Sequence, residues 1–177
     1  MEADQLTAWL DQLIFADLAT DEVTARTIDT VAEWGASQGW RVYRRAPSVM
    51  TLPPPMDRQH SVVDVAFARP DGPPVVVEVD HTDRTRTVDK LLAEARAGRI
   101  AIWVRWGTGP FRPPPMPVQM ATLEVTRRSG RRFARAHDLI PPPPSAGIAA
   151  AEEMTMPFGE AAPPEAAPPH GKGDPGQ

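Results

Sequence analysis

Residues 61–80 read SVVDVAFARPDGPPVVVEVD, and this stretch decides the fold because it predicts a β-hairpin. Two runs rich in β-branched residues flank the turn sequence PDGPP, a pattern typical of hairpins. One face of each predicted strand is apolar, and a slip of one residue would place apolar residues opposite polar ones. The register that avoids this slip pairs Phe67 with Val75, Val65 with Val77, and Val63 with Val79.

The other face of the same hairpin carries acidic residues. The register places Asp64 directly opposite Glu78, and Asp80 opposite Val62. Like charges that face each other across a strand pair are unfavourable, whereas a divalent cation converts the repulsion into coordination by hard oxygen ligands. A solvated outer face is the alternative, but residues 75–77 are all valine, as in a strand that is buried on both sides. The pattern therefore favours a carboxylate site.

The composition of the chain excludes several classes of protein. Its 177 residues have the length of one ordinary domain, and the absence of cysteine excludes disulfides, thiolate zinc sites and cysteine nucleophiles. The first residues, MEADQLTAWLDQ, lack the basic and apolar regions of a signal peptide. No apolar run approaches the roughly 20 residues needed to cross a membrane. These features predict a cytoplasmic protein without a membrane partner.

The net charge of −4 conceals an uneven distribution of charge along the chain. Residues 1–40 contain eight acidic residues and one arginine, and residues 141–177 contain five acidic residues and one lysine. Residues 41–140 hold seventeen basic and ten acidic residues, and all but one of the basic residues are arginine. Because the planar guanidinium binds phosphates bidentately, this block fits contacts with nucleic acid. An arginine-rich surface that only maintains solubility is the alternative.

Two helices and one strand are predicted before the hairpin. Apolar residues at helical spacing predict a helix over 6–18 and a second helix over about 20–37. Residues 40–45 alternate between apolar and polar side chains and predict a strand. The proline-containing segment 46–60 then predicts a long loop, of a length that is often functional.

A strand–helix–strand unit is predicted to begin with the second hairpin strand. Residues 86–98 predict a helix that ends at Gly98, and IAIWVRW at 100–106 predicts a strand. A helix of about a dozen residues between two strands is the usual crossover between parallel strands. Farther along, residues 118–125 predict another strand, and a basic turn at 127–132 precedes a segment that pairs back.

These elements predict a single α/β domain over residues 1–140, with an N-terminal helix in 1–20 and a core in 21–106. Residues 141–177 are rich in proline, alanine and glycine and carry few large apolar residues. Such a segment buries too little surface to offset its ordering entropy, so a disordered tail is predicted. Its PPPP and APPEAAPPH sequences favour extended conformations that a protein partner could bind.

The predicted order of elements over 21–106 is helix, three strands, helix and strand, with acidic residues facing each other on the central hairpin. This arrangement resembles the PD-(D/E)XK, or restriction-endonuclease-like, nuclease superfamily. The resemblance implies an αβββαβ core whose mixed central sheet is flanked by helices. It also implies that Asp64 and Glu78, with the carbonyl of Val79 and with Asp80 as a further candidate ligand, hold one or two Mg²⁺ (or Mn²⁺) ions.

The sequence departs from the family motif at position 80, where Asp80 stands in place of the usual lysine. Some members of the family are thought to supply the lysine from the following helix, and Lys90 is the only lysine before the tail. Helical spacing places Lys90 roughly opposite the apolar face of that helix, so a surface lysine paired with Glu94 is the alternative. Arg84 or Arg86, at the start of the helix, could also take this role.

The resemblance implies a metal-dependent DNA endonuclease that hydrolyses phosphodiester bonds, with Asp64, Glu78 and Lys90 as catalytic residues. Five basic side chains are expected to contact nucleic acid: Arg84, Arg86, Arg44, Arg45 and His60. A nuclease-fold protein that binds nucleic acid or a protein without cleaving is the main alternative, and a small adaptor domain is a third. A homodimer is compatible with each of these, and both DNA and RNA stay open as substrates.

Overall fold

The computed structural model describes residues 1–135, and the predicted disordered tail at 141–177 lies outside the described residues. The described chain is of the mixed α/β class, as predicted, and none of its helices is long and apolar enough to span a membrane. Its elements are α1 (Glu2–Leu10), β1 (Phe15–Leu18), α2 (Thr20–Ser37), β2 (Arg41–Thr51), β3 (His60–Ala68), β4 (Val75–Asp80), α3 (Thr85–Arg96), β5 (Ile100–Gly107), β6 (Gln119–Glu124), β7 (Thr126–Arg127), a 3₁₀ helix (Ser129–Arg131) and β8 (Phe133–Arg135).

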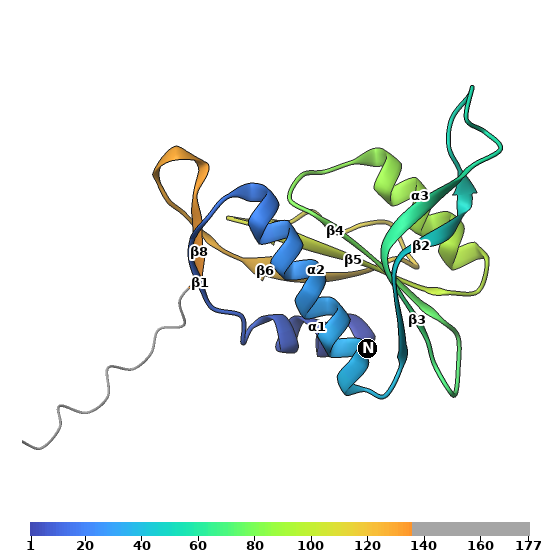
Figure 1. Ribbon diagram of the computed structural model, residues 1–177, viewed down its shortest axis with the longest axis horizontal. Coiled ribbons are helices and arrows are strands. Elements are labelled where there is room, and N and C mark those ends of the chain that lie inside the picture. The colour runs from blue at the N-terminus through green and yellow to red at the C-terminus, as the bar shows by residue number, and fades with distance from the viewer. Residues whose placement is uncertain (136–177) are drawn as a thin grey trace, which may run out of the picture. The chain divides into compact units, whose positions relative to one another are not determined.

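A five-stranded mixed sheet in the order β2-β3-β4-β5-β6 forms the centre of the fold (Figure 1). Strands β2, β3 and β4 are antiparallel neighbours, which confirms the hairpin. Strands β4 and β5 are parallel and joined by α3, which confirms the predicted crossover, and β6 continues the parallel half. A small second sheet, β1-β8-β7, contains β8 from the segment after the basic turn, which was predicted to pair back.

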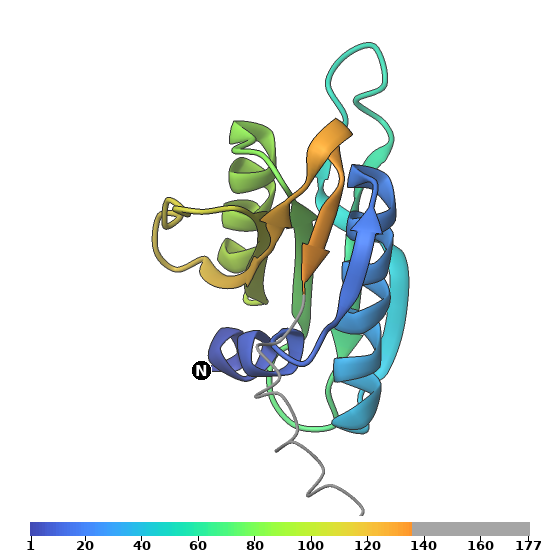
Figure 2. The same ribbon diagram turned by 90° about the vertical axis from the view of Figure 1, so that its left-hand side faces the viewer.

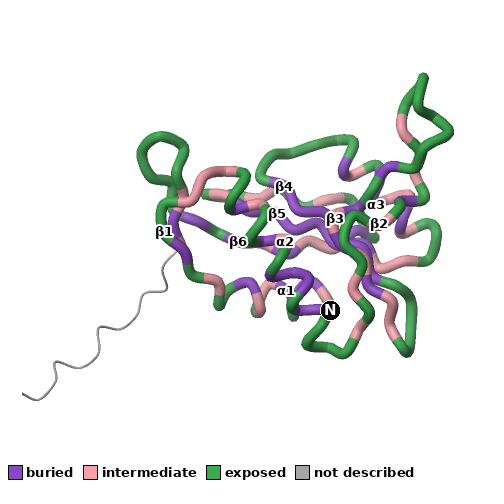
Figure 3. The backbone as a smooth tube through the Cα atoms, in the orientation of Figure 1, coloured by how far each residue is buried: buried purple, intermediate pink, exposed green. Residues whose placement is uncertain are grey.

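Helices cover both faces of the central sheet, with α2 on one side and α3 on the other (Figure 2). The larger apolar cluster joins α1 and α2 to the sheet, and the smaller cluster lies beneath α3. Helix α2 approaches the sheet closely at Gly35, where an added Cβ would lie 2.1 Å from a ring carbon of Phe67. Figure 3 shows the result: β4 and β5 are buried in the interior, and the connecting loops are exposed.

Two predicted boundaries before the hairpin are wrong. The first helix ends at Leu10 rather than at residue 18, because residues 15–18 form β1 and pair with β8, more than a hundred positions away. Asp17 adopts a left-handed backbone conformation (φ 48°), which a continuing helix excludes. The predicted loop over 46–60 is also shorter than expected, since β2 extends to Thr51 and leaves only 52–59 between the strands.

The predicted hairpin register is correct at the turn end of the hairpin and fails at Val63. The pairs Phe67–Val75 and Val65–Val77 are present, but the ladder stops there and Val63 does not pair with Val79. Val63 instead packs in the cluster beneath α3, whereas Val65 packs in the cluster beneath α2. The apolar alternation of β3 is therefore broken at the residue between them, Asp64.

Asp64 breaks the ladder because its side chain takes the place of a backbone acceptor. Its Oδ2 accepts a hydrogen bond of 2.8 Å from the backbone N–H of Val79. On the other side of β3, Arg45 lies across from Asp64, between the pairs Arg44–Val65 and Ala46–Val63, and has a left-handed φ of 51°. Non-glycine residues in this conformation are uncommon and often mark functional sites. Strands β3 and β4 thus separate at Asp64.

Candidate active site

A cavity of about 740 Å³ lies at the point where β3 and β4 separate. Residues of β3, β4, the connection after β4, and helices α2 and α3 line this cavity. Its charged side chains are Asp21, Asp64, Glu78, Asp80, Arg84, Arg86 and Lys90. The three predicted catalytic residues, Asp64, Glu78 and Lys90, therefore share one cavity although they come from three different elements.

Lys90 and Glu78 form the closest contact in the cavity. The Lys90 Nζ lies 2.6 Å from Glu78 Oε1 in an ion pair, and it donates a hydrogen bond of 2.6 Å to the carbonyl of Val62. Lys90 is only 9% exposed and Glu78 only 7%. A buried lysine is costly unless it is paired and hydrogen-bonded, so these two contacts explain why Lys90 is tolerated in the interior.

The structure corrects the predicted placement of Lys90 on α3. Val88, Leu92 and Ala95 pack against the cluster beneath α3 as predicted, but the most buried residues of this helix are Thr87, Lys90, Leu91 and Glu94, so Lys90 does not lie opposite the buried side. The alternative of a solvated lysine paired with Glu94 is also wrong, because Lys90 pairs with Glu78. Glu94 instead contacts Arg99, Ser48 and the backbone N–H of Val49.

The carboxyls of Glu78 and Asp64, which face Lys90, both have raised pKa values. Burial, reinforced by the negative charge of Asp64, raises the pKa of Glu78 to about 7, although Lys90 acts in the opposite direction. Burial also raises the pKa of Asp64, although its hydrogen bond from Val79 and the charge of Lys90 oppose the shift. A single lysine thus does not compensate for burying two neighbouring carboxyls.

Asp80 lines the cavity, but its carboxylate has other partners. Its Oδ2 accepts a bond of 3.1 Å from the indole N–H of Trp103, and its Oδ1 lies 3.5 Å from Nε of Arg84. Among residues 1–135, no group of three or more acidic or histidine side chains is arranged to hold a metal ion. Asp80 as a third ligand stays a prediction.

Asp64 and Glu78 nevertheless offer a donor set that fits a hard divalent cation. Mg²⁺ is commonly held by one or two carboxylates, with water and substrate phosphates completing its shell. Their raised pKa values point the same way, because a cation that displaces the protons would restore the charge balance of the cavity. Val79 also lines the cavity, and its carbonyl as a backbone ligand stays a prediction.

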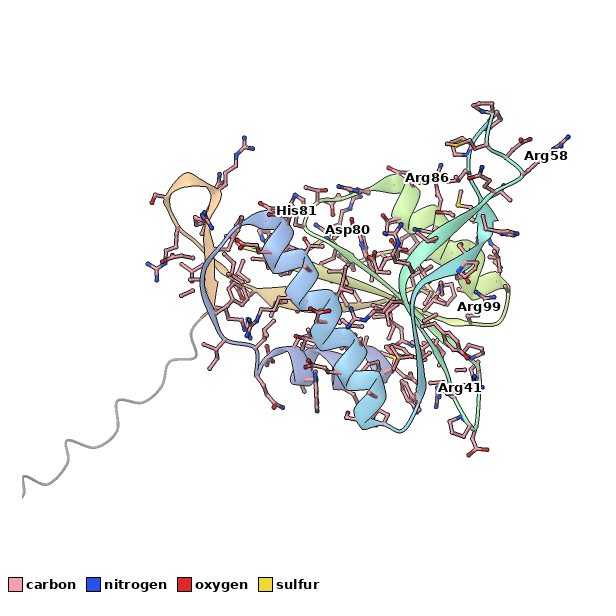
Figure 4. The ribbon with its side chains drawn as sticks, viewed as in Figure 1. Arg41, Arg58, Asp80, His81, Arg86 and Arg99 are labelled. Carbon is pink, nitrogen blue, oxygen red and sulfur yellow. The ribbon has the colours of Figure 1, made fainter. Side chains whose placement is uncertain are left out.

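The predicted nucleic-acid contacts divide into two groups. Arg84 and Arg86 line the cavity together with Asp80 and His81; Arg86, Asp80 and His81 are labelled in Figure 4. Arg44, Arg45 and His60 do not line it. The exposed Arg44 forms an ion pair of 2.6 Å with Asp29, and the Nδ1 of His60 donates to the Ser48 carbonyl at 2.8 Å.

Seven lining residues escaped the sequence analysis: Thr20, Asp21, Thr24, Ala25 and Ile28 of α2, His81, and Thr87 of α3. The His81 ring lies against Trp106, with a centroid separation of 5.2 Å, and Trp106 donates to the Thr24 hydroxyl at 3.2 Å. Burial lowers the pKa of His81, and the charge of Arg84 adds to this effect. The sequence contained no signal for these residues, because helix α2 reaches the cavity only through the tertiary fold.

The raised pKa of Glu78 predicts how stability depends on pH without added metal. The carboxyl titrates near 4.5 in the unfolded chain and near 7 in the fold, so stability falls as pH rises across this window. Urea unfolding in EDTA measures the free energy of unfolding of wild type and Glu78→Gln. We expect the free energy of unfolding of Glu78→Gln, relative to that of wild type, to rise by roughly 2 to 3 kcal/mol from pH 5 to pH 8. A stability difference that is independent of pH would contradict the raised pKa.

Comparison with known proteins adds no relative to this description. No protein-family model, no curated protein and no solved structure matches the chain. The function must therefore be argued from the residues and the geometry of the cavity.

Proposed function

We propose that this protein is a metal-dependent nuclease that hydrolyses phosphodiester bonds in DNA, built on a restriction-endonuclease-like core. The observation that carries the proposal is the ion pair of 2.6 Å between Lys90 and Glu78 in the cavity that also contains Asp64. The sequence lacks a lysine at position 80, and α3 supplies one to the same cavity. Two carboxylates and a lysine from these elements are what the resemblance to the PD-(D/E)XK superfamily requires.

The two carboxylates are the residues that would hold the cation. Asp64 and Glu78 provide hard oxygen ligands, and the carbonyl of Val79 is the candidate third ligand from protein. When bound, Mg²⁺ or Mn²⁺ would lower the pKa of a coordinated water and offset the charge that develops on the phosphate. Asp80 contributes by fixing the neighbouring wall through its bonds to Trp103 and Arg84.

Lys90 is the residue that would position the reacting groups. Its ammonium has three donors; one binds the Val62 carbonyl, and the ammonium also forms an ion pair of 2.6 Å with Glu78 Oε1. A donor that does not bind Val62 would contact a phosphate oxygen or the attacking water. In the reaction, the water oxygen bonds to phosphorus as the ester oxygen leaves with a proton, giving a phosphomonoester and an alcohol. A fixed positive charge beside phosphorus favours this change.

The start of α3 suits a substrate phosphate. Helix N-termini favour acidic residues, because the unpaired N–H groups and the helix dipole carry a partial positive charge. The first turn of α3 has no acidic residue, and Arg84 and Arg86 lie at its beginning. Both arginines line the cavity. An anionic substrate that binds there would meet two arginines and the N-terminus of the helix.

A second basic surface continues from the cavity. The basic turn at residues 127–132 carries four arginines, and Arg132 contacts the Asp17 carbonyl and Glu22 in the first turn of α2. Thr20 and Asp21, which precede Glu22 at the start of α2, line the cavity. Figure 1 shows the basic turn beside the start of α2. The exposed Arg127, Arg128 and Arg131 are therefore placed to contact the phosphate backbone on one side of the cleavage point.

This placement predicts a specific effect on salt dependence. Replacing Arg127 and Arg128 by alanine is expected to weaken DNA binding similarly for all sequences and to lower the slope of log affinity against log salt by about 1 for each lost contact. Fluorescence anisotropy with one labelled duplex at several salt concentrations measures this slope. Arg96→Ala is the control, since this exposed arginine of α3 does not line the cavity and does not belong to the basic turn. Equal slopes for all three proteins would contradict the placement.

Calorimetric titration of Mg²⁺ and Mn²⁺, with plasmid cleavage measured in parallel, tests the proposed function. We expect wild type to bind the ion and nick plasmid, and Asp64→Asn and Glu78→Gln to lose both properties. Asp89→Asn is the matched control, because Asp89 is an exposed acidic residue of α3 next to Lys90. Metal binding without nicking would favour a binding module with a nuclease fold. A folded wild-type protein that binds no metal would refute the carboxylate site.

A further inference from the structure

A second cavity, of about 440 Å³, lies on the α3 side of the sheet beside the candidate active site. Residues of the α3 start and of the proline-rich loop after β5 line it, and Trp103 of β5 is part of its wall. Figure 2 shows this loop projecting on the same side of the sheet as α3. The volume is within the range of about 300 to 1,000 Å³ that is usual for small-molecule sites.

The walls of this cavity are mostly flat and apolar. Residues 113–115 are consecutive prolines on one side, and Val88 of α3 contributes to the wall. Trp103 is only 3% exposed, and two contacts fix its indole. The indole N–H donates to Asp80, and the Arg105 guanidinium lies 4.4 Å from the ring centroid. The cavity is thus bounded by rigid groups that a planar ring could contact.

The charges around the cavity favour a ligand whose planar ring carries an anionic group. Arg84 and Arg112 both line it; Arg84 also lines the candidate active site and lies 3.5 Å from Asp80, so Arg112 is the arginine that lines this cavity alone. The single acidic residue in the wall, Asp83, forms an ion pair with the buried Arg105, so its charge is compensated. A ligand with a planar, largely apolar part and a phosphate would match the prolines and both arginines.

We propose that the second cavity receives an unpaired, unstacked base of the nucleic-acid substrate, from a nucleotide next to the scissile phosphate. The proposal rests on the nuclease function proposed above and narrows its substrate class to single strands or duplexes with unpaired nucleotides. A base inside an intact duplex cannot enter a pocket unless it leaves the stack, which costs free energy. The guanidinium plane of Arg112 and the proline rings supply surfaces that replace stacking.

Binding measurements in EDTA test this proposal independently of cleavage. The probes are three fluorescein-labelled DNA duplexes of the same sequence: intact, with one bulged adenosine nucleotide, and with an abasic bulge at the same position. Wild type is expected to bind the adenosine bulge about tenfold more tightly than the other two. The abasic probe separates recognition of the base from the greater flexibility of a bulged duplex.

Two substitutions alter the cavity in different ways. Arg112→Ala removes an exposed guanidinium from the loop, and Val88→Trp fills the cavity from α3. Both are expected to reduce the tenfold preference to less than threefold. Arg96→Ala removes the same charge elsewhere on α3 and is expected to keep the preference. Thermal unfolding of each variant establishes that the comparison is made between folded proteins.

The outcomes separate this proposal from the nuclease function. Equal affinity for the adenosine and abasic bulges, or an unchanged preference in both cavity variants, would overturn the base pocket, even if wild type cleaves plasmid in the metal assay. A tenfold preference that both variants lose would support the pocket. If plasmid and bulged duplex then stayed uncleaved with metal, the pocket would stand and the catalytic function would fail.

Discussion

Replacing Lys90 by methionine is expected to reduce metal-dependent cleavage of DNA by about 100- to 1,000-fold, while the protein still folds and still binds the cation. Loss of one preorganised donor at a developing charge typically has an effect of this size. The Lys90 ammonium lies 2.6 Å from Glu78 Oε1 and is 9% exposed, so water cannot easily take its place. Methionine has a similar length and fills the same space without the charge.

The fold is expected to tolerate this change because Glu78 can take up a proton. Its pKa is already about 7, and removal of the lysine raises it further, so no uncompensated charge stays buried. Cleavage rates at saturating Mn²⁺, together with calorimetric titration of the ion, measure the two effects separately. Lys90→Arg is the informative partner variant: it keeps the charge, but its larger planar group does not match the site of a compact ammonium. Cleavage by Lys90→Met within threefold of wild type would rule out a catalytic role for Lys90.

Replacing Glu94 by alanine is expected to destabilise the protein by about 3 to 5 kcal/mol. Glu94 is 0% exposed, and its two oxygens have three partners. Oε1 accepts from the Ser48 hydroxyl at 2.6 Å and from the Val49 N–H at 2.8 Å, and Oε2 lies 2.6 Å from Arg99. Truncation leaves a half-buried arginine and two polar groups without their partner, and each such group carries a desolvation cost.

Chemical unfolding of Glu94→Ala, Glu94→Gln and Glu33→Ala measures this effect. Glutamine can still accept the bonds from Ser48 and Val49, so we expect Glu94→Gln to lose less stability than Glu94→Ala. Glu33 is an exposed glutamate of α2, and its replacement by alanine is expected to change stability by less than about 0.5 kcal/mol. A loss below about 1 kcal/mol for Glu94→Ala would show that the buried network between α3 and β2 contributes little.

The sequence was sufficient to predict the strands of the central sheet, the hairpin β3–β4 and the parallel pair β4–β5, because these depend on local patterns. The alternating valines fixed the pairs Phe67–Val75 and Val65–Val77, and the helix between two strands fixed the parallel pair β4–β5. The segment at 15–18 was missed because its pairing partner, β8, lies at the other end of the domain. Apolar periodicity carries no information about such a distant partner.

The candidate site was predicted in its acidic residues but not in its geometry. Asp64 and Glu78 were identified because like charges opposed across a hairpin demand an explanation. The hydrogen bond from Val79 to Asp64, which ends the ladder and separates the strands, could not be inferred from residue types. Lys90 was misplaced because the helix was oriented by its apolar residues alone. Its buried stripe also contains Thr87 and Glu94, at the helical spacing of three and four residues that joins them to Lys90.

Conversion of supercoiled plasmid to the nicked form by wild type and Asp64→Asn, purified identically, tests the central claim most directly. With Mn²⁺, we predict that wild type nicks the plasmid, that EDTA stops the reaction, and that Asp64→Asn is slower by at least about 100-fold. Asp89→Asn is expected to nick at the wild-type rate. Equal nicking by wild type and Asp64→Asn, or no cleavage of either plasmid or bulged duplex by a folded wild-type protein that binds the ion, would contradict the assignment of this cavity as a nuclease active site.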